Sequence, residues 1–419
     1  MRPNRRWPVL SSKVGYNAAV TLLLAIGTFA ASNEKVLYSF SNYGPNGPLG
    51  GLILDNAGNL YGTASYYYGA VFELSPAPGG AWTEQTLYEF TGGDGFAPSA
   101  ALVFDNAGNL YGTTLIGGGT GCGNVGCGTV FELSPVSAGG WTEAVLYRFT
   151  GGSDGGRPSA PLILDAQGNV YGTTTQGGDM SCGNGSGCGT VFELSPGLGG
   201  WTQSVLYAFA GGQDGSNPYT GVIFDKSGNL YGTTAGTGSN KEYGTVFKLT
   251  ASGHGPWKQS VLHRFKGGRD GAGPIGEGLI WDAEGNLYGT TGGGESPADN
   301  GTVFEMRKTK AGWTERVLYR FAGGSDGAFP QGVTFGKPGH LYGTTLFGGP
   351  GHCFGGCGTV FRLVRCGNSW TETVAHDFEQ GGDGQNPAAG LVHGKQDEFF
   401  GTTPWGGANG VGSVFEVKP

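Results

Sequence analysis

The chain has 419 residues and a net charge of −8. It has no long basic patch, so it lacks the footprint of a nucleic-acid-binding protein, and its acidity gives it no electrostatic attraction to anionic lipid. Glycine contributes 88 residues without a collagen period. The aromatic fraction of 12 % excludes a disordered low-complexity chain, since such chains are poor in aromatic residues. We therefore expect the glycines to separate many short strands.

Residues 1–30 have the layout of a secretory signal. Basic residues (Arg2, Arg5, Arg6, Lys13) precede an uncharged apolar run that ends in small residues, which predicts cleavage after Ala30 and a mature chain of residues 31–419. The run is shorter than the roughly 20 apolar residues of a transmembrane helix, and the alternative is an uncleaved anchor. No second apolar run follows. We expect a mature chain without a membrane span that is secreted, periplasmic or associated with the cell surface.

A short string, NLYGT or a close variant, occurs seven times. The copies are 59–63, 109–113, 169–173, 229–233, 286–290, 340–344 and 398–402. The period of roughly 50 to 60 residues matches one propeller blade of four strands.

Four runs recur around this string, in the order GLILD, NLYGT, GTVFEL and WTEAVLYRF, here called a, b, c and d. Each is rich in β-branched and aromatic residues and is bounded by Gly, Pro, Asn or Asp, which is typical of a strand. In one d run, Val145, Tyr147 and Phe149 alternate with Leu146 and Arg148, as a pleated strand requires. We expect the inner (a) strands to start near residues 51, 101, 161, 221, 278, 332 and 390.

The two ends of the repeat array indicate how it closes. The mature chain begins with a lone d run, residues 36–40, and finishes with a c run, residues 412–417. Pairing these two runs would complete the last blade. An open solenoid, the alternative, would leave edges that invite aggregation. The sequence therefore predicts an all-β, single-domain propeller of seven four-stranded antiparallel blades, closed by its N-terminal strand.

Antiparallel order places the b–c and d–a loops on one face of the propeller. An acid recurs in six d–a loops, at Asp94, Asp154, Asp214, Asp270, Asp326 and Asp383. Aspartate is a frequent turn residue, which favours a structural role. The alternative is an acidic ring that binds Ca²⁺, but one carboxylate per loop supplies few of the oxygen ligands that this ion requires. We expect no cofactor and no metal.

The b–c loops vary most between copies, and variable loops on a rigid scaffold commonly carry function. Their aromatic residues are candidates for stacking on sugar rings or anchoring a protein, and the alternative is packing within the loops. The candidates are Tyr66, Tyr67, Tyr68, Tyr243, Phe347 and Trp405.

Three b–c loops carry cysteine pairs, Cys122/Cys127, Cys182/Cys188 and Cys353/Cys357. In an exported protein such pairs predict disulfides. Zinc binding is the alternative, but the spacings differ and histidine is missing apart from His352. Cys366 is left over and is predicted to be a partly buried free thiol.

The sequence shows no convincing catalytic set. The histidines occupy unrelated positions of the repeat, and a G-x-S-x-G elbow is missing. A glycosidase needs two carboxylates across a cleft. The acids that break the repeat symmetry are few: Asp179, Glu242, Glu295 and Asp299. We expect a protein that is not an enzyme, and the alternative is a carbohydrate-active hydrolase or lyase with its site in the central channel.

The combined pattern GNLYGTT…GCGTVFEL…GGWTE…VLYRFTGGSDGGRP resembles the GloVer tandem repeat, named after Gloeobacter and Verrucomicrobia. This resemblance covers residues 36–419. It implies an exported bacterial protein of the "choice-of-anchor" type, without an established activity or catalytic residues, although a C-terminal anchor is missing here. We expect a monomeric binding scaffold that uses the b–c/d–a loop face, with a polysaccharide or a cell-surface protein as its partner.

Overall fold

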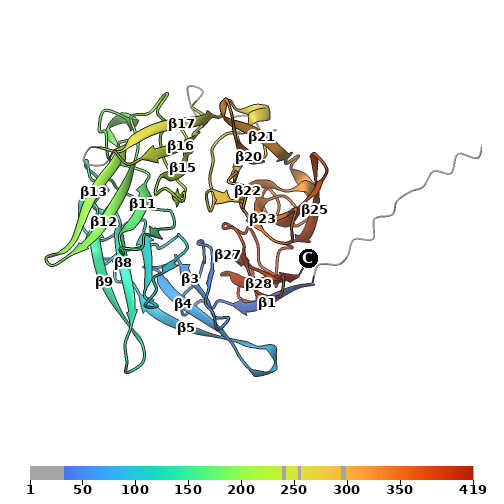
Figure 1. The fold of residues 1–419 in the computed structure, drawn as a ribbon. Helices are drawn as coiled ribbons and strands as arrows, with labels where there is room; N and C mark the ends of the chain where they lie inside the picture. The colour runs from blue at the N-terminus through green and yellow to red at the C-terminus, as the bar shows by residue number, and fades with distance from the viewer. Residues whose placement is uncertain (1–32, 238–241, 253–255, 294–298, 419) are drawn as a thin grey trace, which may run out of the picture. The chain divides into compact units, whose positions relative to one another are not determined.

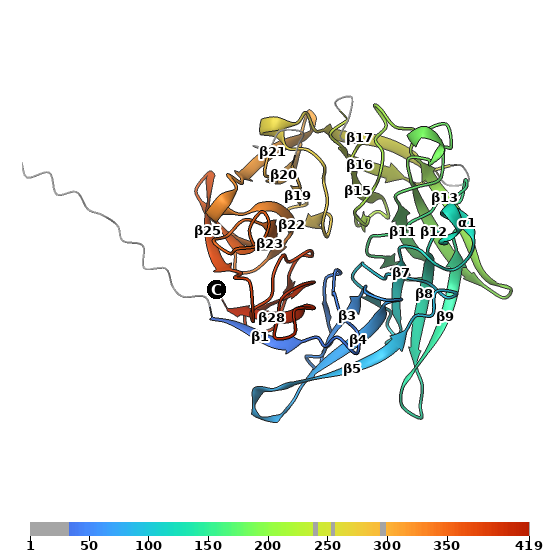
Figure 2. The same ribbon diagram turned by 180° about the vertical axis from the view of Figure 1, so that it is seen from behind.

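The computed structural model describes residues 33–237, 242–252, 256–293 and 299–418. The predicted signal peptide, residues 1–30, lies outside these ranges. Seven four-stranded antiparallel sheets form a seven-bladed β-propeller (Figures 1 and 2), which confirms the predicted fold class. Within the described ranges, we find no helix with the length and apolar character that a membrane crossing requires.

Each blade runs a, b, c, d from the axis outward. The a strands are β2 (Ile53–Leu54), β6 (Val103–Phe104), β10 (Ile163–Leu164), β14 (Ile223–Phe224), β18 (Ile280–Trp281), β22 (Ala328–Phe335) and β26 (Val392–His393). The b strands are β3 (Leu60–Ala64), β7 (Leu110–Thr114), β11 (Val170–Thr174), β15 (Leu230–Thr234), β19 (Leu287–Thr291), β23 (His340–Phe347) and β27 (Phe399–Thr403).

The outer strands are longer. The c strands are β4 (Ala70–Pro76), β8 (Thr129–Pro135), β12 (Thr190–Gly197), β16 (Thr245–Thr250), β20 (Thr302–Thr309), β24 (Thr359–Cys366) and β28 (Ser413–Lys418). The d strands are β5 (Trp82–Glu89), β9 (Trp141–Arg148), β13 (Gly200–Ala208), β17 (Lys258–Arg264), β21 (Gly312–Arg320), β25 (Ser369–Asp377) and β1 (Asn33–Ser39). One short helix, α1 (Gly121–Asn124), lies in the b–c loop of blade 2 (Figure 2).

The inner strands are shorter than the sequence runs that encode them. In six blades, pairing starts two residues after the predicted start, and only two residues pair. In blades 1, 2, 4 and 7, a residue before the pair instead accepts a hydrogen bond from the b strand of the preceding blade, as the carbonyl oxygen of Ala100 does from Thr63 Oγ1 at 3.1 Å. Blade 6 differs, because β22 starts at Ala328 and pairs with β23 around an irregular step between Pro330 and Val333.

The N-terminal strand closes the ring. Strand β1 pairs with β28 from Asn33 opposite Lys418 to Ser39 opposite Ser413, so the first strand of the fold is the outer strand of the last blade (Figure 1). The next residue, Phe40, continues the contact by donating its backbone N–H to the carbonyl oxygen of Gly412 at 3.0 Å. The predicted closure is therefore confirmed.

A contact between two phenylalanines recurs at every blade interface. The residue after each d strand packs edge-to-face on the c-strand phenylalanine of the next blade, with centroids 5.0 to 5.2 Å apart. At the closure, Phe40 contacts Phe72 in this way. The Phe72 ring lies on the b-strand glycine, and a Cβ on Gly62 would stand 2.6 Å from its Cζ. This close approach explains the glycine of the YGT string.

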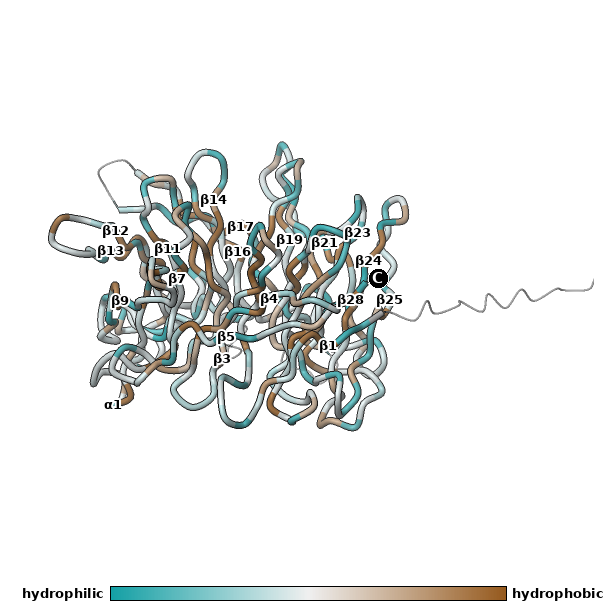
Figure 3. Tube along the Cα trace, turned by 90° about the horizontal axis from the view of Figure 1, so that it is seen from below, coloured by the Kyte–Doolittle hydropathy of each residue, from teal (hydrophilic) through white to brown (hydrophobic). Residues whose placement is uncertain are grey.

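The d strands do not alternate strictly. In β9, Tyr147 pairs with Val130 and Val145 pairs with Phe131, so Leu146 forms a bulge. The same irregularity occurs in the other c–d pairs within blades 1 to 6. A bulge adds an unpaired residue and re-aims its side chain. As a result, Leu146 joins the apolar cluster between blades 2 and 3. Figure 3 shows that hydrophobic segments run through the middle of the blades.

A second repeated contact between blades involves carboxyl groups. The third residue of the WTE segment faces the d–a loop that precedes its blade. In blades 3 and 4 this residue is glutamine, and the Nε2 atoms of Gln203 and Gln259 donate to the carbonyl oxygens of Asp154 and Asp214 at 3.1 and 3.0 Å. In blades 2, 5 and 6 it is Glu143, Glu315 or Glu372, each with a buried Oε1 that has no protein hydrogen-bond partner.

These glutamates lie in an environment that favours the protonated form. Burial raises the pKa of Glu143 and of Glu315 to about 7, with Asp94 and Asp270 adding to the effect. Burial and then Asp326 raise the pKa of Glu372 to about 8. A protonated carboxyl can donate a hydrogen bond, as the amides of Gln203 and Gln259 do. The glutamates therefore occupy donor positions at these interfaces.

Removing the closing strand should open the ring. We expect a chain that starts at Ser41 to melt at a markedly lower temperature than one that starts at Asn33, because β28 loses its partner and Phe72 loses Phe40. The single change Phe40→Ala should cost about 3–5 kcal/mol by emptying a packed site. Thermal unfolding by circular dichroism measures both effects. Equal melting temperatures for the two chain starts would show that the closure does not stabilise the fold.

The interface glutamates should make stability fall as the pH rises. Their pKa is higher in the folded chain than the ordinary 4.5, so folding takes up protons, and the free energy of unfolding declines between about pH 4.5 and pH 8. Burial lowers the pKa of His263, which acts in the opposite sense. Urea titrations across this range should show a shallower decline for the combined variant Glu143→Gln, Glu315→Gln, Glu372→Gln.

The reverse change provides the matched control. Gln203→Glu places a carboxyl at the same position of blade 3 and should steepen the decline over the same range, between about pH 4.5 and pH 8. Curves that stay parallel for the wild type and both variants would contradict the assignment.

Candidate functional site

The repeated acids of the two faces are held by their own turns. On the a–b face, Asp55 accepts hydrogen bonds from the backbone nitrogens of Gly58 and Asn59 at 2.7 and 2.8 Å. On the d–a face, Asp94 accepts from the backbone nitrogen of Thr91 at 2.8 Å and from the hydroxyl of Tyr88 at 2.6 Å. In the other five loops the carboxylate accepts a similar hydrogen bond from the backbone nitrogen of the residue four positions earlier. These acids are Asp154, Asp214, Asp270, Asp326 and Asp383. The six carboxylates thus lie in six separate loops.

One blade interface brings three potential metal ligands together. His263, Asp270 and Glu315 present ligand atoms within 4.8 Å of one another, with 3.2 Å between His263 Nε2 and Asp270 Oδ2. The trio occupies the same place in the repeat as Tyr88, Asp94 and Glu143. The histidine therefore forms the interface bond that the tyrosine hydroxyl forms between blades 1 and 2.

The three predicted disulfides are confirmed. Cys122–Cys127, Cys182–Cys188 and Cys353–Cys357 each close a b–c loop. The prediction for Cys366 was wrong in one respect: the thiol is free, but it is exposed at the end of β24 rather than partly buried. The reason is that Cys366 is the last residue of β24, beside the turn of the c–d hairpin, where residues 365–369 are all exposed.

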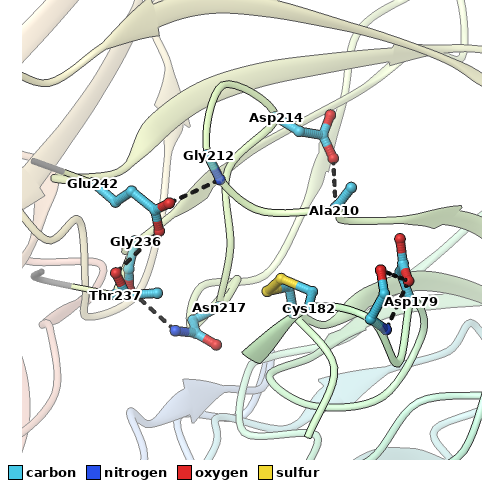
Figure 4. The surroundings of a disulfide bond; sticks show 11 residues. Asp179, Cys182, Ala210, Gly212, Asp214, Asn217, Gly236, Thr237 and Glu242 are labelled. Carbon is cyan, nitrogen blue, oxygen red and sulfur yellow. Dashed lines mark hydrogen bonds between the residues drawn. A yellow bond between two sulfur atoms is a disulfide. The ribbon is translucent and has the colours of Figure 1, made fainter. Parts of the chain in front are cut away.

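Two of the acids that break the repeat symmetry, Glu242 and Asp179, accept hydrogen bonds from residues of the loops. Glu242 accepts from the backbone nitrogen of Gly212 and from the hydroxyl of Thr237, both at 3.0 Å (Figure 4). Asp179 accepts from the backbone nitrogen of Ser181 at 2.9 Å, in the loop of the Cys182–Cys188 disulfide. Asp299 is partly buried, and Glu295 lies outside the described residues.

The mouth of the central channel holds one carboxyl group that the sequence analysis missed. Glu277 lines a pocket of about 170 Å³ to which inner segments of all seven blades contribute. It is the only carboxyl among the described residues that line this pocket. From blade 5 it reaches blade 7, where it accepts from the backbone nitrogen of Gly390 at 3.3 Å. Burial raises its pKa, and hydrogen bonds from the backbones of Gly390 and Gly51 oppose the rise.

A sequence signal marks Glu277. Blade 5 has one extra residue between the proline of its d–a loop and the leucine of its inner strand, Pro274 and Leu279. The other blades carry Gly50, Ala100, Ala160, Thr220, Gln331 or Ala389 at the position of Glu277. Alignment of the copies around this short segment would have singled the residue out.

Exposed aromatic side chains gather on three adjacent blades, 6, 7 and 1. We call Tyr43, Tyr66, Tyr67, Tyr68, Phe354 and Trp405 the aromatic strip; Tyr43, Tyr67 and Phe354 are 100 %, 73 % and 97 % exposed. Of the exposed aromatic residues in the described chain, Tyr219 alone lies elsewhere, at the channel mouth. The strip therefore breaks the sevenfold symmetry of the loop face.

Two depressions flank the centre of the strip. The first, of about 260 Å³, is lined by Tyr66, Tyr67, Tyr68, Tyr43 and Asn42, among others. The second, of about 460 Å³, is lined by Phe347, His352, Phe354, Gln380, Gln385 and Trp405, among others. Trp405 donates from Nε1 to the hydroxyl of Tyr66 at 2.6 Å, so this pair forms the ridge between them.

The backbone around the second depression is held in place. Gln385 donates its backbone N–H to the carbonyl oxygen of Trp405 at 2.9 Å. Asn386 donates from Nδ2 to the carbonyl oxygens of Leu346 and Gly356 at 2.8 and 3.1 Å. The Cys353–Cys357 disulfide closes the adjoining loop. A site held in this way needs little ordering when a ligand binds, which favours affinity.

The structure brings five of the six predicted aromatic candidates together. Tyr66, Tyr67, Tyr68 and Trp405 belong to the strip, and Phe347 lines the second depression while packing edge-to-face on Phe329 at 5.5 Å. Tyr243 is separate. It is partly buried against Phe265 and Leu279 between blades 4 and 5, with its ring over Gly267.

The sequence analysis missed two strip residues, Tyr43 and Phe354. Tyr43 lies in the d–a loop after β1, which lacks the aspartate of the other six loops, and that departure from the repeat is the available signal. Phe354 stands between the cysteines of the Cys353–Cys357 loop, where the disulfide alone explained the sequence.

Solved structures with a similar fold are distant in sequence. An ancestral GH74 enzyme matches with a TM-score of 0.52 and 11 % identity over 89 % of this chain and 48 % of that one. PorZ of Porphyromonas gingivalis, a bacterial surface component of the type-IX secretion system, matches with 0.51 and 14 % over 91 % and 48 %. A putative 6-phosphogluconolactonase from Bacteroides uniformis matches with 0.48 and 13 % over 78 % and 83 %. At these identities the likeness shows the fold alone.

The family comparison is more direct. No curated protein matches the chain. The Gloeobacter/Verrucomicrobia repeat, in contrast, matches residues 15–185, 66–293 and 180–363, which confirms the resemblance seen in the repeated strings. The chain belongs to the Gloeobacter/Verrucomicrobia repeat family.

Proposed function

We propose that this protein is an exported, non-enzymatic scaffold that binds glycans or cell-surface proteins through its b–c/d–a loop face. The observation that carries the proposal is the aromatic strip, because it concentrates exposed aromatic side chains on blades 6, 7 and 1 of an otherwise repetitive face. Such a patch on a soluble protein marks an interaction site.

Export is supported by the chemistry of the loops and by the N-terminal sequence. Three disulfides within single loops are consistent with an oxidising, extracellular environment. The basic and apolar residues of 1–30 have the layout of a secretory signal. We place the protein outside the cytoplasm, either free or at the cell surface.

The central channel is a weaker candidate for a binding site than the aromatic strip, and it is a weak candidate for a hydrolytic site. The pocket of about 170 Å³ at the channel mouth is smaller than the roughly 300–1,000 Å³ typical of ligand sites, whereas the second depression falls within that range. A glycosidase uses two carboxyl groups. Glu277 is the single carboxyl lining the pocket among the described residues, and its hydrogen bond to Gly390 links two blades.

Aromatic substitutions should separate the strip from the channel. We expect Tyr67→Ala combined with Phe354→Ala to weaken binding to a glycan array or to intact cells at least tenfold, because both rings are exposed and contribute contact area. Tyr219→Ala, at the channel mouth, should leave binding unchanged and serves as the matched control. Loss of binding with Tyr219→Ala alone would move the site to the channel.

A hydrolysis screen on the same polysaccharides tests the alternative activity. We expect no release of reducing ends or unsaturated products. Turnover that Glu277→Gln abolishes would overturn the non-enzymatic proposal and assign a carbohydrate-active enzyme.

A further inference from the structure

We propose that the ligand of the aromatic strip is an uncharged polysaccharide chain that crosses blades 6, 7 and 1. This inference rests on the proposed binding function and narrows it to one class of glycan. The Tyr66–Trp405 ridge joins the two depressions, so one extended ligand can contact both.

The charge of the surrounding loops disfavours acidic sugars. Segments 40–48, 64–70, 346–358, 378–388 and 403–412, which form this part of the face, contain no lysine and no arginine. Of the other five d–a loops, two do contain such residues, one at Arg157 and one at Lys266 and Arg269. Carboxylate and sulfate groups are recognised by charge-assisted hydrogen bonds, for which arginine is the preferred donor. The strip has no such donor where the ligand would lie.

The charged groups that are present would repel an anionic chain. Glu89 lines the first depression, and Glu379 and Asp383 lie in the loop that borders the second. Asp383 accepts a hydrogen bond from the backbone nitrogen of Glu379 at 3.0 Å, as a carboxylate does. Like charges disfavour binding, so these acids discriminate against uronates and sulfated glycans.

The polar groups of the second depression match hydroxyl groups. Gln380 and Gln385 each carry an acceptor oxygen and two N–H donors, and a sugar hydroxyl both donates and accepts. His352 adds a ring nitrogen of either kind. The aromatic rings supply flat apolar surfaces of the kind that pack against the C–H faces of pyranose rings. Amides beside exposed rings, without cations, are the complement of a neutral sugar chain.

A folded protein partner fits this surface less well. Protein interfaces bury a continuous core with a polar rim. Here the rings stand on separate glycine-rich loops around two depressions, and amide side chains line the larger one. An extended polysaccharide chain can contact both depressions and the rings around them along its length. Binding of a protein partner is therefore one of the outcomes that the experiments below distinguish.

Affinity gel electrophoresis with soluble polysaccharides tests the inference on the full-length secreted protein. Gels carry a mixed-linkage β-glucan, an arabinoxylan or a galactomannan as neutral probes, and alginate or polygalacturonate as anionic probes. We expect retardation by at least one neutral probe and none by the anionic probes. Phe354→Ala and Trp405→Ala should each weaken the retardation at least tenfold, and Leu198→Ala, an exposed residue of a c–d hairpin, should not.

A pair of charge variants gives a second readout. Gln380 is exposed at the edge of the second depression, so Gln380→Lys and Gln380→Glu should both fold, and equal melting temperatures check this. For an uncharged ligand, the two variants should bind alike. Stronger binding by the lysine variant, weaker binding by the glutamate variant and loss of binding in salt would identify an anionic ligand.

The outcomes separate the inference from the function on which it rests. Preference for an anionic probe would overturn the inference and leave glycan binding in place. Binding of a cell-surface protein, with no retardation by any polysaccharide, would overturn the inference and leave the protein branch of the proposed function. Failure to bind both polysaccharides and cells would overturn the inference and the proposed function together.

Discussion

The edge-to-face contact between phenylalanines of successive blades is the interaction on which the structure depends. Each ring lies fully buried or nearly so, and the c-strand partner covers the glycine of the YGT string. A larger residue than glycine would push the ring away from its neighbour, so the glycine and the two phenylalanines form one unit. Because the unit occurs at all seven interfaces, the blades follow one another at similar spacing, and the ring closes.

Sequence repetition predicted the fold because each repeat encodes this unit. The number of blades followed from counting copies, and the closure followed from the unequal ends of the array. The details that escaped prediction are those that depend on neighbours. The inner strands pair over only two residues in six blades, where a residue before the pair, such as Ala100, bonds to the preceding blade. The bulge at Leu146 arises because its side chain packs into the cluster between blades.

The candidate site could be predicted only in part for a related reason. Variable loops identified Tyr66 to Tyr68 and Trp405, but these residues stand near opposite ends of the chain, and nothing in the sequence measures the distance between them. The sequence did not single out Phe354, because the two cysteines around it already explained that loop as a disulfide loop. Tyr43 lies in a d–a loop rather than a b–c loop. Tyr243 has the same sequence character as the strip residues, yet packing against Phe265 and Leu279 removes most of it from solvent.

The ring closure and the aromatic strip therefore lie at the same place in the molecule. The loop that carries Tyr43 follows β1, and the loop that carries Trp405 precedes β28, so the pairing of these two strands brings the N-terminal and C-terminal parts of the strip together. The hydrogen bond from Trp405 to Tyr66 crosses this same boundary between blades 7 and 1. In an open array the two depressions would belong to separate ends of the protein. The strand pairing that completes the ring is thus also what assembles the aromatic strip from distant segments of the chain.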